Sequence, residues 1–467
     1  MNDNTKAGDK LGFWSIVFLA INSIIGSGIF LTPGSVVSQA GSKSLLVYLI
    51  AAIFASILAI SFAAASKYVT KSGAAYAYSK AAFGDKVGFY MGVLRYFSAS
   101  VAWGVMAVGV IKSTISIFGG DPNNTLSVTI GFLILMALIT LINLFGQKVV
   151  KYVMNLATIG KLAALVLIIV AGVVLLITTG VSHNLNTVDQ ITQNGQKIVP
   201  TLTTTGFVMA IVSAFYAFTG FESVASGSED MKEPEKNLPR AIPLAILVIA
   251  AIYIGVVAVA MLVNPRALMT TKQVVAISAI FKNEILRDII LVGALVSMFG
   301  INVASSFNAP RILEAMAREN QMSKALTKRT KNDFPIRTFF ISVALAILIP
   351  MAFQYDMVNL ITLSAMVRFL GFIVVPLAVI QFYRGKSKEK VLDAPKSAWT
   401  DVIVPILSIL LVVFLLVEYN WKVQFGIVVN GKVVGVNWYA IAMMIFGFII
   451  LPLIMFWISK SERKNEK

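Results

Sequence analysis

The chain has 467 residues, of which 58% are hydrophobic and only 13% are charged, and its mean hydropathy is +0.83. Soluble domains carry about 25% charged residues, so this composition excludes an ordinary soluble protein and predicts one embedded in a membrane. A net charge of +17 is typical of nucleic-acid binding in a soluble chain, but here the basic residues follow a membrane pattern and imply no nucleic acid. The absence of cysteine and the single histidine, His183, exclude a disulfide framework, a thiolate metal site and a histidine-based catalytic cluster.

Twelve apolar runs are long enough to cross a bilayer as helices, which takes roughly 20 residues each. They cover residues 13–37, 43–66, 88–118, 125–145, 153–179, 201–227, 241–263, 288–310, 337–354, 357–383, 399–418 and 437–459. The connections between them are mostly short and leave no room for a separate soluble domain. The sequence therefore predicts an all-α integral membrane protein with 12 transmembrane helices.

The basic residues are distributed unevenly between the two sides of these runs. If the N-terminus lies inside, 27 of the 39 lysines and arginines fall in the two tails and the loops on the inner side, with Arg337 at the edge of its run counted as inner. The outer loops hold 8, with Lys43 at the edge of its run counted among them, and the interiors of the runs hold 4. This excess follows the positive-inside rule, so we expect both termini to be cytoplasmic and the protein to lie in the cell membrane. The polar segment Met1–Lys10 is too short for a signal peptide, and the first run lacks a cleavage site, so that run is expected to remain as a helix.

The first run carries the triplet Gly26-Ser27-Gly28 at its centre. Glycine has no Cβ and loses much conformational freedom in a helix, so the triplet favours local unwinding. Unwound backbone in a membrane is tolerated only where protein buries it or a watery cavity meets it, and broken helices of secondary transporters line midplane substrate sites. Carbonyl groups near Ile24 and the N–H groups of Ser27 and Gly28 are then expected to bind the two charged ends of a small molecule. A helix-packing glycine pair is the alternative, but the triplet lacks the small-xxx-small spacing.

The sixth run has a second midpoint break, where Gly220 and Glu222 interrupt the apolar sequence. The two broken runs are five apart. This odd offset reverses the direction of the second copy, as an inverted repeat of five plus five helices requires. We therefore expect a first repeat over residues 1–180, a second repeat over 181–384, and two added helices with a cytoplasmic tail over 385–467.

Three features together resemble the amino acid–polyamine–organocation permeases, over nearly the whole chain. They are Gly26-Ser27-Gly28-Ile29-Phe30, then Phe218-Thr219-Gly220-Phe221-Glu222 followed by Pro234-Glu235-Lys236-Asn237-Leu238-Pro239-Arg240, and Lys161 in the fifth run. The resemblance implies a leucine-transporter-like inverted repeat and an amino acid or polyamine substrate. It also implies that the substrate backbone contacts Ile24, Ser27, Gly28, Tyr216 and Thr219, and that Tyr216 and Phe218 form a gate. For Phe218, an ordinary apolar position in the bundle is the alternative.

Lys161 lies inside the fifth run, where a lysine is costly and indicates function by default. The alternative is an interfacial lysine that reaches the cytoplasm, since Lys148 and Lys151 are near. The resemblance implies that Lys161 packs against the broken first helix, where sodium-coupled relatives hold a cation. A lysine buried there can have its pKa lowered enough to exchange a proton, so we predict sodium-independent transport with Lys161 as the coupling residue. The side chains of Asn302, Ser305 and Ser306 in the eighth run keep a sodium site open as an alternative.

Three other charged side chains inside the runs, Arg95, Glu222 and Arg368, are expected to form a charge network. Arginine stays charged, so each arginine needs a carboxylate, carbonyls or water as its partner. We expect Arg368 to pair with Glu222; the alternative is that it recognises an acidic substrate side chain. Glu222 either caps the second half of the broken sixth helix, pairs with a basic residue or carries a proton. Arg95 is expected nearer the cytoplasmic surface.

Together these features predict a secondary active amino acid transporter that works by alternating access, sodium-independent and proton-coupled, for neutral amino acids. An amino acid exchanger that accepts acidic or amine substrates is the alternative. An enzyme or a channel fits less well, because the sequence has no metal-ligand cluster, nucleotide-binding motif or filter-like loop. The expected partners are the amino acid, protons and membrane lipid; no cofactor, metal, nucleic acid or obligate protein partner is implied.

Overall fold

The computed structural model describes residues 11–71, 73–145, 147–180, 185–225, 231–271, 275–330, 334–429 and 432–465. Its helices, in chain order, are α1 (Phe13–Ile24), α2 (Gly28–Leu31), α3 (Pro33–Ala40), α4 (Ser44–Tyr68), α5 (Ala75–Phe83), α6 (Asp85–Ile117), α7 (Thr125–Leu144), α8 (Gln147–Thr179), α9 (Thr204–Tyr216), α10 (Phe221–Ala225), α11 (Pro234–Val263), α12 (Pro265–Thr270), α13 (Glu284–Arg318), α14 (Ile336–Ala352), α15 (Met357–Tyr383), α16 (Val404–Glu418), α17 (Trp421–Gln424), α18 (Trp438–Ile445) and α19 (Leu451–Asn465). Short 3₁₀ segments form η1 (Gly41–Lys43), η2 (Leu185–Gln190), η4 (Ala276–Ile280) and η5 (Lys324–Thr327), and π-helical turns form η6 (Trp399–Ile403) and η7 (Phe446–Ile450). The single histidine, His183, lies outside the described residues.

Ten helical segments of the described chain are long and apolar enough to cross a membrane, judged by length and composition. Two of the predicted runs, 201–227 and 337–354, contain shorter apolar helices instead: α9 has 13 residues and α14 has 17. Helix α9 is short because it ends at Tyr216, ahead of the predicted break. The nearly all-helical, multi-pass architecture expected from composition is therefore confirmed. Only ten of the 12 predicted spans contain a described helical segment long enough to cross a membrane.

The all-α prediction omitted two small β-hairpins. Strands β1 (Thr192–Gln193) and β2 (Gln196–Lys197) pair antiparallel, with Thr192 opposite Lys197. Asn194 and Gly195 between them both have positive φ, which is the backbone geometry of the tight turn that an Asn-Gly pair favours. Strands β3 (Gly426–Val429) and β4 (Lys432–Val436) form the second hairpin, between α17 and α18. Both hairpins belong to connections between the long helices.

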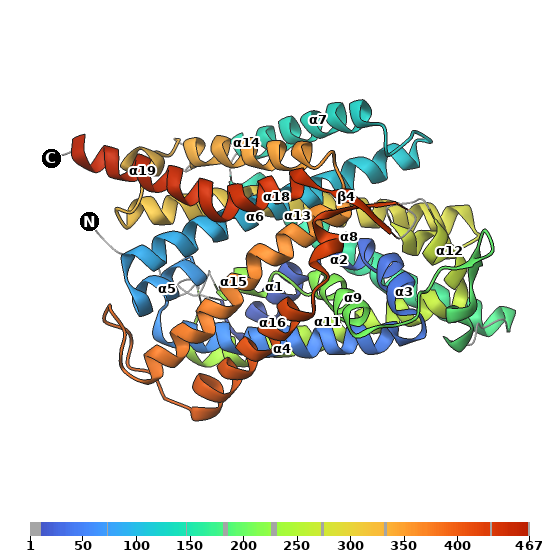
Figure 1. Ribbon diagram of the computed structural model, residues 1–467, viewed down its shortest axis with the longest axis horizontal. Helices are drawn as coiled ribbons and strands as arrows, with labels where there is room; N and C mark the ends of the chain where they lie inside the picture. Colours follow the sequence, from blue (N-terminus) through green and yellow to red (C-terminus); the bar gives the residue numbers. More distant parts are fainter. Residues whose placement is uncertain are drawn as a thin grey trace.

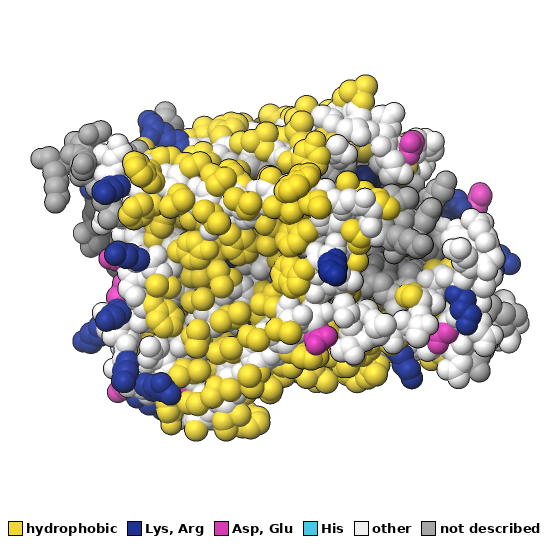
Figure 2. Space-filling model, in the orientation of Figure 1, with side chains coloured by type: hydrophobic (Ala, Val, Ile, Leu, Met, Phe, Trp, Pro, Cys, Tyr) yellow, Lys and Arg dark blue, Asp and Glu magenta, His cyan; other side chains and the backbone are white. Residues whose placement is uncertain are grey.

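The long helices lie roughly along the long axis of the molecule (Figure 1). Helix α6 packs along α13, which also contacts α8, while α4 packs along α11 and α11 contacts α1. In Figure 2, hydrophobic side chains cover a broad central band and most visible lysines and arginines lie toward the two ends of the long axis. This arrangement suits a bundle whose middle faces lipid, because charged groups avoid the hydrocarbon core.

Charged side chains connect separate loops at the end of the molecule where α5 lies. The Lys80 Nζ atom on α5 is 2.6 Å from Glu319 Oε2 and 3.1 Å from Glu389 Oε1. The hydrogen bond from Lys80 holds the pKa of Glu319 below its ordinary value, so the pair stabilises the fold at neutral pH and loses this effect only as the pH falls through that lowered pKa. The segment after α15 is thereby attached to α5 and to the end of α13.

Two helix junctions touch each other in the centre of the bundle. Helix α1 ends at Ile24 and α2 begins at Gly28, while α9 ends at Tyr216 and α10 begins at Phe221. A Cβ placed on Gly28 would lie 2.5 Å from the Cα of Ala217 in the other junction. A Cβ on Gly220, whose φ is +123°, would lie 2.3 Å from the Ser23 carbonyl oxygen. Both glycines are therefore required by close backbone contact between the two junctions.

We predict that Gly220→Ala destabilises the protein by about 2 kcal/mol or more, because it combines an unfavourable φ with a backbone clash. The melting temperature of the purified protein measures this effect. Gly385→Ala is the matched control: its φ is also positive, at +66°, but its Cβ would meet nothing within 4 Å. Equal melting temperatures for the two variants would show that the contact between the junctions is not tight.

Candidate functional site

A cavity of about 310 Å³ lies where the two junctions meet, at the small end of the range for ligand sites. Its wall is built from α1, α6, α8, the α9–α10 junction, α13 and α15. The lining includes these residues singled out from the sequence: Ile24, Ser27, Gly28, Arg95, Lys161, Tyr216, Thr219, Glu222 and Arg368. Phe218 is not among them. The fold thus brings together side chains from six separate parts of the chain around one cavity.

Side-chain hydroxyls bond to carbonyl groups at both junctions. Thr219 Oγ1 donates to the carbonyl of Tyr216 at 2.8 Å, and Ser297 Oγ on α13 donates to the carbonyl of Gly26 at 3.4 Å. Buried carbonyls outside regular helices need such partners. These bonds hold the two junctions in defined shapes although the helices stop there.

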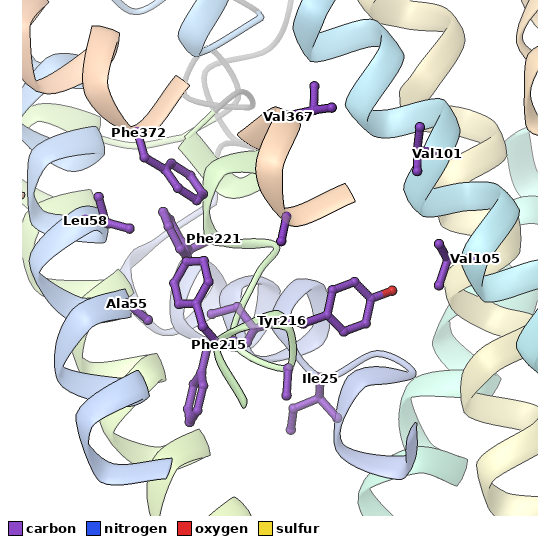
Figure 3. Close-up of a cluster of buried hydrophobic side chains, with 14 of the residues drawn as sticks. Ile25, Ala55, Leu58, Val101, Val105, Phe215, Tyr216, Phe221, Val367 and Phe372 are labelled. Carbon is purple, nitrogen blue, oxygen red and sulfur yellow. The ribbon is translucent and has the colours of Figure 1, made fainter. Parts of the chain in front are cut away.

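The side chains of Tyr216 and Phe218 point in different directions, one toward the cavity and the other toward α11. Figure 3 shows the Tyr216 ring extending toward α6, where Val101 and Val105 lie, and away from the cluster of phenylalanine side chains behind it. Phe218 is fully buried, and its ring centroid is 5.1 Å from that of Tyr253 on α11. Tyr216 therefore borders the cavity, whereas Phe218 packs the second junction against α11.

The phenylalanine cluster fixes both sides of the second junction. Phe215 precedes it and Phe221 follows it, and both rings lie within 6 Å of the Phe372 ring on α15, at 5.7 and 5.8 Å between centroids (Figure 3). Aromatic pairs at such distances stabilise beyond the area they bury. The junction is therefore attached to α15 on the face opposite the cavity.

Lys161 on α8 is attached to the end of α1 by three acceptors. Its Nζ atom donates to the backbone carbonyls of Asn22 at 2.6 Å and Ile25 at 2.7 Å, and also to the side-chain oxygen of Asn22. The Thr158 hydroxyl, one turn earlier on α8, donates to the same Asn22 oxygen at 2.7 Å. An ammonium group has three N–H donors and no acceptor, so this set of oxygens matches a charged lysine. Lys161 is 3% exposed and lies at the cavity wall.

Sequence reasoning missed Asn22, although a signal was present. It is the only amide side chain in the first half of the run 13–37 and stands four residues before the glycine triplet. A polar side chain there could have been matched to Lys161 only by knowing that α8 crosses α1 at this level. Helical spacing within one run gives no information about which other run lies beside it.

Glu222 lies between two arginines at the cavity wall. Its Oε1 atom is 3.4 Å from Arg95 Nη1 and 3.6 Å from Arg368 Nη1, and its Oε2 atom accepts the backbone N–H of Gly220 at 2.8 Å. Charge-assisted hydrogen bonds to arginine are typically about 2.7–2.9 Å, so both contacts are long. Arg95 belongs to this buried group, with 14% of its side chain exposed, rather than to the cytoplasmic surface. One carboxylate is thus shared by two guanidinium groups.

Of the polar residues expected on the eighth run, Ser305 lines the cavity. Ser306 accepts a hydrogen bond from Asn143 on α7 at 2.8 Å, and Asn302 donates to the carbonyl of Met298. These two side chains therefore bond within the bundle. In the described ranges, no three histidine, aspartate or glutamate side chains gather in a way that could hold a metal ion.

The cavity offers opposite kinds of binding group at one place. Backbone at the start of α2 and the guanidinium groups can bind an anionic group, because the first N–H groups of a helix lack intrahelical acceptors. Backbone carbonyls at the end of α1 can bind a cationic group for the corresponding reason. This arrangement suits a small dipolar ligand.

The chain matches the family model described as amino acid permease over residues 11–451. It therefore belongs to the amino acid permease family, and the resemblance seen in its motifs is confirmed. It is a multi-pass membrane protein of a family that transports amino acids.

Individual relatives agree with this assignment. An uncharacterized transporter of Mycobacterium tuberculosis is 38% identical over 454 residues, covering 95% of this chain and 93% of that protein. The branched-chain amino acid permease BcaP of Bacillus subtilis is 27% identical over 446 residues, covering 88% of each chain. The serine/threonine exchanger SteT of the same organism is 28% identical over 323 residues, covering 67% of this chain and 69% of that protein.

We predict that Asn22→Ala weakens the attachment of Lys161 to α1 and lowers transport at least about tenfold, since a hydrogen bond to a charged group contributes about 1.5–3 kcal/mol. Initial rates of amino acid uptake across a range of pH measure the effect. Asn143→Ala is the control, because it removes a buried amide that bonds to Ser306 and does not line the cavity. Equal changes in the pH profile of uptake for both variants would contradict the role of Asn22 in holding Lys161 against α1.

Proposed function

We propose that this protein is a secondary active amino acid transporter of the cell membrane that works by alternating access. The observation that carries the proposal is the cavity of about 310 Å³ bordered by both helix junctions. Membership of the amino acid permease family supports the substrate class. The proposal includes a first repeat over residues 1–180, an inverted second repeat over 181–384, and two added helices with a cytoplasmic tail over 385–467.

In this proposal the chain crosses the membrane 12 times, with both termini in the cytoplasm. Helices α9 and α14 are too short by themselves, but α9 together with the junction and α10 covers the distance of a full span. The excess of lysine and arginine in alternate loops supports the orientation. The position of α5 and of the C-terminal end of α19 at the same end of the molecule agrees with it (Figure 1).

The amino acid backbone binds between the two junctions. Its carboxylate accepts from the N–H groups of Ser27 and Gly28 and from the Ser27 hydroxyl, and its ammonium group donates to carbonyls near Ile24. Tyr216 and Thr219 complete this set from the second junction, and Tyr216 acts as the gate. Phe218 is assigned to holding the junction against α11, because it does not line the cavity.

The cavity extends toward the cytoplasmic side of this binding position in the proposed orientation. Its lining includes Leu19 on α1, on the N-terminal side of the first junction, Met154 near the start of α8, and Ile312 near the end of α13. In the proposed orientation, the N-terminal ends of α1 and α8 and the C-terminal end of α13 lie on the side where the N-terminus is placed. The described conformation is accordingly assigned as inward-facing, with the Tyr216 ring on the outer side of the substrate.

Lys161 is the proposed coupling residue. Its ammonium group is bound by the α1 carbonyls of Asn22 and Ile25, which are the acceptors that a cation such as sodium would need. We therefore propose sodium-independent, proton-coupled transport, in which loss of the Lys161 proton releases α1 from α8. Neutral amino acids are the proposed substrates, since apolar side chains such as Met106 and Ile301 line much of the cavity. An exchange mode is the second candidate, favoured by the similarity to a serine/threonine exchanger.

Counterflow in liposomes tests the transport proposal. Proteoliposomes loaded with an unlabelled amino acid should accumulate the same labelled amino acid from outside, for at least one of the twenty common amino acids. The required controls are liposomes without protein and proteoliposomes containing Gly220→Ala. Absence of counterflow for all twenty, with folded protein in the membrane, would contradict the proposal.

Proton coupling is tested with Lys161→Ala. We expect accumulation driven by an inward proton gradient to fall at least about tenfold, and replacement of sodium by choline to leave uptake by the unmodified protein unchanged. Lys112→Ala is the control, because Lys112 is another lysine within a span but does not line the cavity. Full pH-dependent uptake by Lys161→Ala would show that coupling lies elsewhere.

A further inference from the structure

The cavity wall carries more positive than negative charge. Its lining holds the cationic side chains Arg95, Lys161 and Arg368 and, among the described residues, the single carboxylate Glu222. The charge of Lys161 is matched by its own three oxygen acceptors on α1. The excess positive charge is therefore located in the group formed by Glu222 and the two arginines.

Arg368 is the member of this group with the weakest set of partners. Arg95 donates to Glu222 at 3.4 Å and to the Ser223 hydroxyl at 3.2 Å. Arg368 Nε donates to the Ser98 hydroxyl at 3.4 Å, whereas its Nη1 atom has no hydrogen-bond acceptor among the described residues and lies 3.6 Å from Glu222 Oε1. The Arg368 side chain is 10% exposed. A buried guanidinium with an unused donor is costly, because its lost hydration is not replaced.

The free space beside Arg368 lies on the side of the main cavity. A second cavity of about 20 Å³ shares Arg95, Glu222 and Arg368 in its lining, so the three side chains form a partition between the two spaces. The small cavity has room for about one water molecule. A larger anionic group can therefore reach the Arg368 guanidinium only from the main cavity.

Helix α6 leaves room along this wall for a substrate side chain. Ala99 and Ala102 line the cavity four and seven positions after Arg95, which places all three on one face of the helix. These small side chains line the cavity over a rise of about 10 Å along α6, from Arg95 to Ala102. An acidic side chain that extends along this wall ends close to the arginines.

We propose that the site also takes amino acids whose side chain ends in a carboxylate, and that Arg368 is the residue that selects them. This inference rests on the proposed transport function and extends its substrate class beyond neutral amino acids. The side-chain carboxylate accepts from Arg368 Nη1 and neutralises the surplus charge of the partition. Cationic amino acids and polyamines are excluded by the same surplus, because like charges repel at close range in a buried site.

The test uses the purified full-length protein and thermal stability in the presence of L-glutamate, L-aspartate, L-glutamine, L-asparagine and L-lysine. Each acid and its amide have nearly the same size and differ in charge, and a bound ligand raises the melting temperature by mass action. We expect the acids to stabilise at concentrations at least about tenfold lower than their amides, and lysine to have no effect. Labelled glutamate uptake into proteoliposomes then shows that the bound acid is carried.

The variant Arg368→Gln assigns the effect to one side chain. It should raise the half-saturating concentration of glutamate at least about tenfold and leave that of glutamine unchanged. Lys112→Gln is the matched control, since it removes one positive charge from α6 without touching the cavity, and it should leave both values unchanged. If Arg368→Gln does not fold, the comparison of glutamate with glutamine on the unmodified protein still decides the question.

The outcomes separate this inference from the transport proposal. Binding and uptake of neutral amino acids without any response to glutamate or aspartate would overturn the acidic-substrate inference and leave the transporter intact. Equal loss of glutamate binding in Arg368→Gln and Lys112→Gln would overturn the role of Arg368. No response to any amino acid in binding, uptake or counterflow would overturn the transport proposal itself.

Discussion

The structure depends on close backbone contact between two helix junctions. Gly28 lies against Ala217, and Gly220 lies against Ser23, at distances that leave no room for a Cβ on either glycine. Because the helices stop on both sides of this contact, peptide groups that a continuous helix would use internally are presented to the cavity. Hydroxyl groups of Thr219 and other side chains bind part of these carbonyls and fix the geometry. The cavity exists because the two junctions meet at one level of the bundle.

The buried charges around this cavity differ in how well they are matched. Lys161 has an acceptor for each of its three donors, and these acceptors come from a different helix. The Arg95–Glu222–Arg368 group has one carboxylate for two guanidinium groups, with long contacts. A lysine whose three N–H donors all bond to a neighbouring helix weakens that contact when it loses its proton. An arginine with an unused N–H donor is suited to binding an anionic ligand reversibly. This difference supports the two proposed roles, coupling for Lys161 and substrate selection for Arg368.

Composition, run length and isolated charges were sufficient to predict the helical membrane architecture and to single out the charged residues that line the cavity. Gly28, Glu222 and Arg368 are visible in the sequence because glycine triplets and charges are unfavourable inside apolar runs. Contacts between runs could not be predicted in the same way. Asn22 was missed because its role depends on the contact between α8 and α1. The sequence also leaves Phe218 open between a gate and an ordinary apolar position, and only the fold shows its ring against Tyr253 on α11. The β1–β2 hairpin was missed because an Asn-Gly turn is a short local signal in a connection.

The most direct measurement uses the natural absence of cysteine from this chain. A single cysteine is introduced by Ala304→Cys on α13, at the cavity wall, and its rate of reaction with a small maleimide is measured with and without amino acids. Asn123→Cys, at an exposed position before α7, serves as the reference. We expect a transported amino acid to slow labelling at residue 304 and to leave labelling at residue 123 unchanged. Labelling at residue 304 that no amino acid slows, in protein that transports amino acids, would show that the substrate binds elsewhere.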